Sequence, residues 1–170
     1  MQERKLTIFF TSDLHSYIYP TDYRSQAKKE LGLFKCASQF QKDGNTLIID
    51  GGDLLQDSPL GAFCHDTVGS AAQFAEIMNR CGYDYVTLGN HDFNYGMPYL
   101  DSYLDALRAR CVCENVRFPA RVHVLENGLR VGIVGIVTDY VNIWEHPEHL
   151  SGIRIKDPIT SAAAALVKLK

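Results

Sequence analysis

The chain has 170 residues, the length of one domain, with 22% charged residues and no low-complexity segment. Its 17 Lys and Arg residues are outnumbered by 20 Asp and Glu residues and are scattered, which excludes the basic surface that binds duplex nucleic acid. No apolar stretch is long enough for a membrane helix or for the core of a signal peptide, so we expect no membrane association. The five cysteines, an odd number, favour free thiols in a reducing compartment, and we expect a cytoplasmic location.

The first two thirds of the chain alternate between short apolar runs and segments with helical periodicity. The apolar runs predict strands at residues 7–11, 46–49, 85–88 and 111–116. The periodic segments predict helices at residues 27–42, 68–81 and 98–110, with Thr67 as the N-cap of the second. A strand–helix–strand rhythm of this kind predicts an α/β fold, with parallel strands joined by crossover helices.

The pattern changes in the last third of the chain. An Asn127-Gly128 pair separates two alternating runs, residues 121–126 and 129–137, and such a pair is the strongest short-range signal for a β-hairpin. We expect this antiparallel pair to join the parallel strands in a mixed sheet. Residues 139–152 lack a period and predict a loop, and Asp157-Pro158 predicts the start of a last helix.

Three of the predicted strands end in loops rich in side chains that bind metal ions. Asp13-Leu14-His15 follows the first strand, Asp50-Gly51-Gly52-Asp53 ends the second, and Gly89-Asn90-His91-Asp92 follows the third. Because the carboxyl ends of parallel strands share one edge of a sheet, we expect these loops to meet at a ligand crevice. The paired glycines permit a tight turn that lets Asp53 approach an ion closely.

The residue types in these loops match the ligands of a pair of divalent ions. Two ions about 3.5 to 4 Å apart can activate a bridging water as a nucleophile and stabilise both oxygens of an in-line displacement at phosphorus. We predict that Asp13 and His15 hold the first ion, that Asp53 bridges the two ions, and that Asn90 holds the second ion through its amide oxygen.

His91, the residue after Asn90, is expected to face the phosphate. Its imidazole can donate a hydrogen bond or a proton to the leaving oxygen, a step worth roughly 10²–10⁴-fold in rate. We predict His91 and Asp92 as the catalytic pair, with Asp92 orienting its neighbours. The alternative is that these residues only form turns and helix caps, where Asp, Asn and Gly are common. Three such loops, each at a strand end, favour the metal site.

Together these loops resemble the first three motifs of the calcineurin-like metallophosphoesterases. Two further segments, Phe93-Asn94-Tyr95-Gly96 and Gln56-Asp57-Ser58-Pro59-Leu60, are similar to the branch of 5′-nucleotidases and 2′,3′-cyclic-nucleotide 2′-phosphodiesterases. The resemblance implies an αββα sandwich, of which this chain is the first half. It also implies two divalent ions, such as Mn²⁺, Zn²⁺ or Fe, and hydrolysis of the phosphate esters of small nucleotides in nucleotide catabolism.

The sequence departs from this family at Asn94. Many 5′-nucleotidases of the family have an acid there that pairs with the catalytic histidine, and a neutral amide cannot stabilise an imidazolium ion in that way. Without such an acid, His91 is expected to act mainly as a hydrogen-bond donor. An asparagine fits the cyclic-nucleotide phosphodiesterases better, which favours cyclic or 3′-nucleotide substrates.

A second departure is the lack of the three further histidines that complete the family's metal sites, which have no counterpart after His91. The segment His146-Pro147-Glu148-His149 is predicted to be a loop, because Pro147 argues against a helix that would align both rings on an ion. We therefore expect an incomplete second metal site and a weakly active or inactive chain. Residues 1–170 are expected to be the N-terminal portion of the catalytic domain, without its last metal motifs and its separate nucleotide-binding domain.

A second class of function stays open, namely a non-catalytic module that keeps the fold and serves in binding or as a scaffold. The missing histidines favour this class, and the three strand-end motifs favour the enzyme. Hydrolytic activity of a longer reading frame that contains this chain distinguishes the two.

Overall fold

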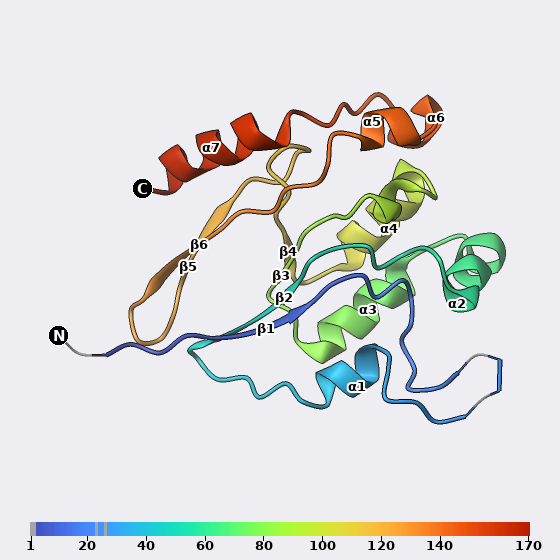
Figure 1. The fold of residues 1–170 in the computed structure, drawn as a ribbon, viewed down its shortest axis with the longest axis horizontal. Coiled ribbons are helices and arrows are strands. Elements are labelled where there is room, and N and C mark those ends of the chain that lie inside the picture. Colours follow the sequence, from blue (N-terminus) through green and yellow to red (C-terminus); the bar gives the residue numbers. More distant parts are fainter. Residues whose placement is uncertain (1–2, 23, 26) are drawn as a thin grey trace.

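The computed structural model describes residues 3–22, 24–25 and 27–170, and its centre is a sheet of four parallel strands. The strands are hydrogen-bonded in the order β1-β2-β3-β4. They comprise β1 (Thr7–Thr11), β2 (Thr46–Asp50), β3 (Tyr85–Val86) and β4 (Arg110–Cys111). The expected α/β class with a parallel sheet is therefore confirmed, and Figure 1 shows the helices α1 and α3 on one side of this sheet.

The apolar sequence of β2 explains its central place in the sheet. Leu47 and Ile48 alternate between its two faces and are 0% and 1% exposed. β1 pairs with β2 over its whole length, whereas β3 pairs with it at two positions only, Ile49 with Tyr85 and Asp50 with Val86. The third and fourth strands are shorter than predicted because the chain leaves the sheet soon after each of them begins.

The first helix, α1 (Leu33–Ala37), has five residues, so the prediction of a helix over residues 27–42 is wrong in its extent. Lys28 forms a β-bridge with Thr21 instead of entering a helix. Gly32 then adopts a φ of +85°, and a Cβ at this position would lie 2.6 Å from the carbonyl oxygen of Tyr19. A helix cannot pass through such a residue, and α1 therefore begins only after it.

The second crossover begins with two short helical segments, α2 (Pro59–Phe63) and a π-helical turn (Cys64–Val68), before α3 (Ala72–Cys81). The prediction of one helix that starts at residue 68 with Thr67 as its N-cap is wrong. Thr67 lies inside the π-helical turn, which ends at Gly69 with a φ of +70°. A glycine in this left-handed conformation ends one helix and lets the next start in a new direction.

The helix predicted over residues 98–110 is present as α4 (Met97–Ala106), with Pro98 in its first turn. It packs against α3 on one face of the sheet. Arg108 and Arg110, which were expected in its last turn, lie beyond its end, and Arg110 belongs to β4. The largest apolar cluster of the molecule lies between these helices and the sheet, and its fully buried members include Phe74, Leu88 and Leu100.

The predicted hairpin is present as β5 (Arg121–Val124) and β6 (Arg130–Ile133), which pair antiparallel. It forms a two-stranded sheet of its own, so the single mixed sheet that we expected is divided into two. A second apolar cluster packs the hairpin against the parallel sheet and consists of Leu47, Tyr85, Val112, Leu125 and Ile133. Figure 1 shows the hairpin and α7 on the side of the sheet opposite α1 and α3.

The last three helices are α5 (Val141–Trp144), α6 (Pro147–Leu150) and α7 (Pro158–Leu169). The first two occupy a segment that was predicted to be a loop, and Pro147 opens α6 instead of preventing it, because proline fits the first turn of a helix. Figure 1 places α5 and α6 towards the end of the sheet where the strands stop. None of the helices in the described ranges has the length and apolarity to cross a membrane.

Candidate metal and catalytic site

Backbone hydrogen bonds join the loop after β1 to the loop after β2. The amide of Asp13 donates to the carbonyl oxygen of Gly52 at 3.0 Å, and the amide of His15 donates to that of Asp53 at 2.9 Å. The pairing of the two strands therefore continues beyond their ends. It brings the first two predicted motifs side by side.

Two glycines allow the loop after β3 to approach the loop after β2. A Cβ at Gly52 would lie 2.2 Å from the backbone nitrogen of Gly89, and a Cβ at Gly89 would lie 2.1 Å from Oδ1 of Asp53. Contacts of this length are not possible for any residue with a side chain. Glycine is required at both positions because the two backbones touch there.

The side chain of Asp92 connects the same two loops through hydrogen bonds to their backbone. One of its carboxylate oxygens accepts from the backbone N–H groups of Asp53 at 3.0 Å and Gly89 at 2.9 Å, and the other accepts from those of Leu54 and Leu55 at 3.0 and 3.2 Å. The side chain is almost fully buried, and burial raises the pKa of its carboxyl group. The structure thus gives Asp92 an architectural task, holding Asp53 in place, and its part in catalysis stays a prediction.

Three of the predicted ligands converge on one point. One ligand atom from each of Asp13, His15 and Asp53 can be chosen so that all three lie within 4.8 Å of one another. Nδ1 of His15 lies 2.8 Å from the carbonyl oxygen of Gln56, which can only accept, so Nδ1 carries the proton and Nε2 is free to bind an ion. Two carboxylates and one such imidazole fit a divalent transition metal ion.

The backbone at these ligands is held in a conformation that residues with side chains rarely adopt. The φ angles are +53° at Asp13, +46° at His15 and +57° at Asp53. This left-handed conformation is unfavourable for residues other than glycine, by about 1–2 kcal/mol each, and it persists only where the surrounding structure imposes it. Such residues are concentrated at functional sites, which is consistent with a metal site here.

His91 lies beside the three converging ligands. Its backbone N–H donates to Oδ1 of Asp53 at 2.7 Å, and its ring centroid is 5.2 Å from that of His15. Asn90 directly precedes the 3₁₀ turn that His91 begins, between two residues, Gly89 and His91, that contact Asp53. These positions are compatible with the predicted roles of Asn90 at a second ion and of His91 at the substrate, and both roles stay predictions.

One polar group beside this site, Glu145, was not predicted from the sequence. Nδ1 of His91 lies 2.8 Å from Oδ1 of Asn94, and Nδ2 of Asn94 donates to Oε1 of Glu145. Oε2 of Glu145 accepts from Nδ1 of His149 at 3.0 Å. His146 and His149, considered as substitutes for missing metal ligands, are not part of the metal-binding group found among the described residues.

Asp50 lies buried beneath the converging loops, at the end of β2. It is 1% exposed, and its carboxylate accepts from the hydroxyl of Thr11 at 2.5 Å and from the N–H of Gly52 at 3.0 Å. Burial raises its pKa to about 7, although both hydrogen bonds act in the opposite direction. Asp50 supports the turn that presents Asp53, and it does not reach the ligand group itself.

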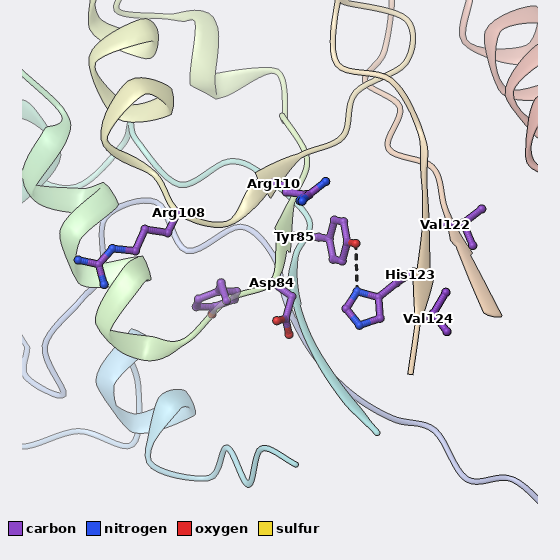
Figure 2. A pocket seen from close by; sticks show the side chains of 8 residues that line it. Asp84, Tyr85, Arg108, Arg110, Val122, His123 and Val124 are labelled. Carbon is purple, nitrogen blue, oxygen red and sulfur yellow. Dashed lines mark hydrogen bonds between the residues drawn. The ribbon is translucent and has the colours of Figure 1, made fainter. Parts of the chain in front are cut away.

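A pocket of about 400 Å³ lies at the other end of β3, between the sheet and the hairpin. Figure 2 shows Tyr85 and His123 facing each other in it, joined by a hydrogen bond of 3.1 Å, while Arg108 extends away from them. The pocket contains none of the predicted site residues. His123 is thus part of a separate cavity.

Fold and site together define a class: an α/β protein with a metal-binding group where its parallel strands stop. The chain belongs to the calcineurin-like phosphoesterase family, whose pattern matches residues 6–161. This family is metal-dependent, and the expected family is confirmed.

Similar proteins act on nucleotides, according to their names. The trifunctional nucleotide phosphoesterase YfkN of Bacillus subtilis is 30% identical over 97% of this chain and 13% of its own length. The 2′,3′-cyclic-nucleotide 2′-phosphodiesterase/3′-nucleotidase of Yersinia enterocolitica is 30% identical over 93% of this chain and 28% of its own length. The chain thus spans less than a third of either relative.

Solved structures confirm the fold. A Staphylococcus aureus protein, provisionally assigned as a 5′-nucleotidase, superimposes with a TM-score of 0.85 and 28% identity, over 95% of this chain and 34% of that one. The structure of YfkN from B. subtilis superimposes with a TM-score of 0.79 and 29% identity, over 96% of this chain and 57% of that one.

Proposed function

We propose that this chain supplies the catalytic loops of a two-metal phosphoesterase that hydrolyses phosphate esters of nucleotides. The observation that supports this most is the convergence of the ligand atoms of Asp13, His15 and Asp53, all three on left-handed backbone. Residues that only form turns or caps do not need their side chains to meet at one point. Membership of the calcineurin-like phosphoesterase family supports the same conclusion.

In this proposal Asp13 and His15 hold a first divalent ion, Asp53 lies between two ions, and Asn90 holds the second through its amide oxygen. The donor set suits Mn²⁺, Zn²⁺ or Fe. When bound, such ions supply an activated water and stabilise the charge that develops during an in-line displacement. Since the second ion has two of these ligands and the first has three, we expect this chain to bind the second ion more weakly.

His91 is the proposed partner of the leaving oxygen. Its backbone N–H is fixed by Asp53 and its Nδ1 by Asn94, so the ring is held in one orientation, with Nε2 as the nitrogen left for a substrate. A proton or hydrogen bond from Nε2 would stabilise the alkoxide of a departing ribose hydroxyl.

The proposed substrates are 2′,3′-cyclic nucleotides and 3′- or 5′-nucleotides. The names of similar proteins support this class, since one is a 2′,3′-cyclic-nucleotide 2′-phosphodiesterase/3′-nucleotidase and another is a 5′-nucleotidase. Asn94, where many 5′-nucleotidases of the family have an acid, favours the cyclic and 3′-nucleotides among them.

Mn²⁺-dependent hydrolysis of bis-p-nitrophenyl phosphate and of 2′,3′-cyclic AMP tests the proposal, measured for this chain and for the longest reading frame that contains it. The substitution Asp53→Asn removes one charge at constant volume. We expect it to lower kcat/KM by more than the roughly 100-fold that removal of an outer-sphere partner costs. Asp57→Asn is the matched control, because Asp57 is exposed in the same loop and also has a positive φ, and it should leave the rate unchanged.

Calorimetric titration with Mn²⁺ gives a second readout that does not depend on turnover. Asp53→Asn should abolish the heat of binding, and Asp57→Asn should not. A longer protein that stays inactive with every divalent metal tested would contradict the enzyme and support a binding or scaffold module instead.

A further inference from the structure

A chain of hydrogen bonds links the ring of His91 to the segment between α5 and α6. The ring nitrogen Nδ1 lies 2.8 Å from the amide oxygen of Asn94, whose Nδ2 donates to the carboxylate of Glu145. The second carboxylate oxygen accepts from Nδ1 of His149 at 3.0 Å. Glu145, which is 51 residues from Asn94 in the sequence, therefore reaches His91 through a single amide group.

The donor and the acceptor of each of these hydrogen bonds follow from the carboxylate of Glu145. A carboxylate can only accept, so the amide of Asn94 must turn its NH₂ group towards Glu145. Its oxygen then faces His91, and because this oxygen also can only accept, Nδ1 of the ring must carry a proton. Nε2 is left as the ring nitrogen that can meet a substrate.

Without Glu145 the amide of Asn94 has no fixed orientation, because its two ends have almost the same size and shape. A flipped Asn94 would donate to Nδ1 and move the proton of the neutral ring to Nε2. The doubly protonated ring would then have an N–H group against an NH₂ group, which is repulsive. The orientation of one amide thus decides which protonated forms of His91 are favourable.

The surroundings of Glu145 suit this task. Its side chain is 8% exposed, so its negative charge polarises Asn94 with little screening by water. It is the C-cap residue of α5, and His149 on α6 holds its other oxygen, so both short helices fix the carboxylate in place. The α5–α6 segment offers no ligand to the metal-binding group, yet it contacts the site through this residue.

We propose that Glu145 is a positioning residue for His91, acting through Asn94 to keep one proton on Nδ1. The second proton of the imidazolium then lies on Nε2, towards the leaving oxygen, and its transfer leaves a neutral ring protonated on Nδ1. This inference rests on the proposed function, in which His91 assists the leaving group. The contribution of His91 to the rate grows with the basicity of the leaving oxygen. A p-nitrophenolate can depart without receiving a proton, whereas a ribose alkoxide needs one.

Steady-state kinetics of Glu145→Gln with two diesters tests the proposal in the longest reading frame that contains this chain. We expect kcat for 2′,3′-cyclic AMP to fall by about 10–100-fold, the range for loss of an outer partner, with KM unchanged. The rate with bis-p-nitrophenyl phosphate should stay the same. Glu148→Gln is the matched control, since it makes the same change at an exposed position of α6. Equal losses with both substrates, or no loss with either, would overturn the proposal.

A double substitution separates positioning from simple support of the fold. Asp at position 94 beside Glu145 brings two carboxylates together, so Asn94→Asp alone should be poor. In Asn94→Asp combined with Glu145→Gln, the glutamine donates to the new carboxylate, which faces Nδ1 directly. We expect this double variant to recover most of the activity on 2′,3′-cyclic AMP that Glu145→Gln loses. A double variant no better than either single one would contradict the proposal.

Nitrogen NMR of the ¹⁵N-histidine-labelled 170-residue chain reads the ring without any turnover. At a pH where His91 is neutral, we expect Nδ1–H in the native chain and a shift of the proton towards Nε2 in Glu145→Gln. A native ring protonated on Nε2 would overturn the inference. If the longer protein hydrolyses neither substrate with any metal, the proposed function fails, and the NMR result still decides whether Glu145 sets the proton on His91.

Discussion

The two ends of strand β3 make an instructive comparison, because polar side chains gather at both. Gly89 and His91 follow β3 and lie next to the converging side chains of Asp13, His15 and Asp53. At the start of β3, residues 83–85 line the pocket that Figure 2 shows, together with residues of the hairpin. The second end has a pocket of about 400 Å³, and the first has the candidate metal-binding group.

The difference lies in the charge of the groups that are brought together. At the pocket end, Asp84 pairs with Lys42 at 2.7 Å and accepts from the N–H of Ile48 at 2.9 Å, and Tyr85 pairs with His123. At the other end, the carboxylates of Asp13 and Asp53 are held close together, on backbone that costs free energy. Convergence of like charges on strained backbone is the feature that distinguishes the end of the strand where we propose the metal site.

The largest loss in the free energy of unfolding from a substitution is expected for Asp92→Ala. This change leaves four backbone N–H groups without an acceptor in the interior, and each such group costs about 1–3 kcal/mol. We expect the free energy of unfolding, measured by urea denaturation with chelator present, to fall by about 3 kcal/mol or more.

Asp84→Ala is the matched change at the opposite end of β3. Asp84 bonds one backbone N–H and one lysine, and its side chain is 19% exposed, so we expect a loss of about 1 kcal/mol. Equal losses for Asp84→Ala and Asp92→Ala would mean that the two ends of β3 do not differ in the way described.

An effect of comparable size on the free energy of unfolding is expected from the titration of Asp50. Its pKa is raised by burial from an ordinary 3.8 to about 7, so between these values the folded state holds a proton that the unfolded chain has lost. The resulting stabilisation is fully present below pH 3.8 and is lost as the pH rises through about 7. With chelator present, the free energy of unfolding of the native chain should therefore fall by a few kcal/mol across this range, relative to Asp50→Asn.

The free energy of unfolding of the native chain and of Asp50→Asn, measured against pH, tests this prediction. Asp92 is shifted in the same direction, but it is present in both proteins and cancels in the difference. Parallel curves would show that burial does not raise the pKa of Asp50 in the folded state.

The strands and the three residues of the candidate metal-binding group could be predicted because their signals are local. β1 and β2 are mainly apolar, and Asp13, His15 and Asp53 follow within four residues of the strand ends. The helix predicted over residues 27–42 failed for a reason that lies elsewhere in the chain, since Thr21 pairs with Lys28 and the carbonyl of Tyr19 lies against Gly32. Periodicity records the apolar spacing and not such tertiary contacts.

Glu145 could not be predicted for a related reason. α5 and α6 have four residues each, which is too short for a periodic pattern, so their segment read as a loop. The contact with Asn94 depends on where these helices lie in space. The nearby histidines drew attention to the segment for metal binding, whereas the residue that reaches the site is the acid before them.

The smallest effect is expected at the pocket, from His123→Gln. This change removes the hydrogen bond to Tyr85, which is worth about 0.5–1.5 kcal/mol, and should leave the Mn²⁺ affinity unchanged because His123 lies at the other end of the strand from the ligands. Tyr85→Phe removes the same bond from the other side and should match it in urea denaturation. A loss of Mn²⁺ binding in either variant, at full folding, would show that the two ends of β3 are coupled. The metal site would then depend on the hairpin as well as on its own loops.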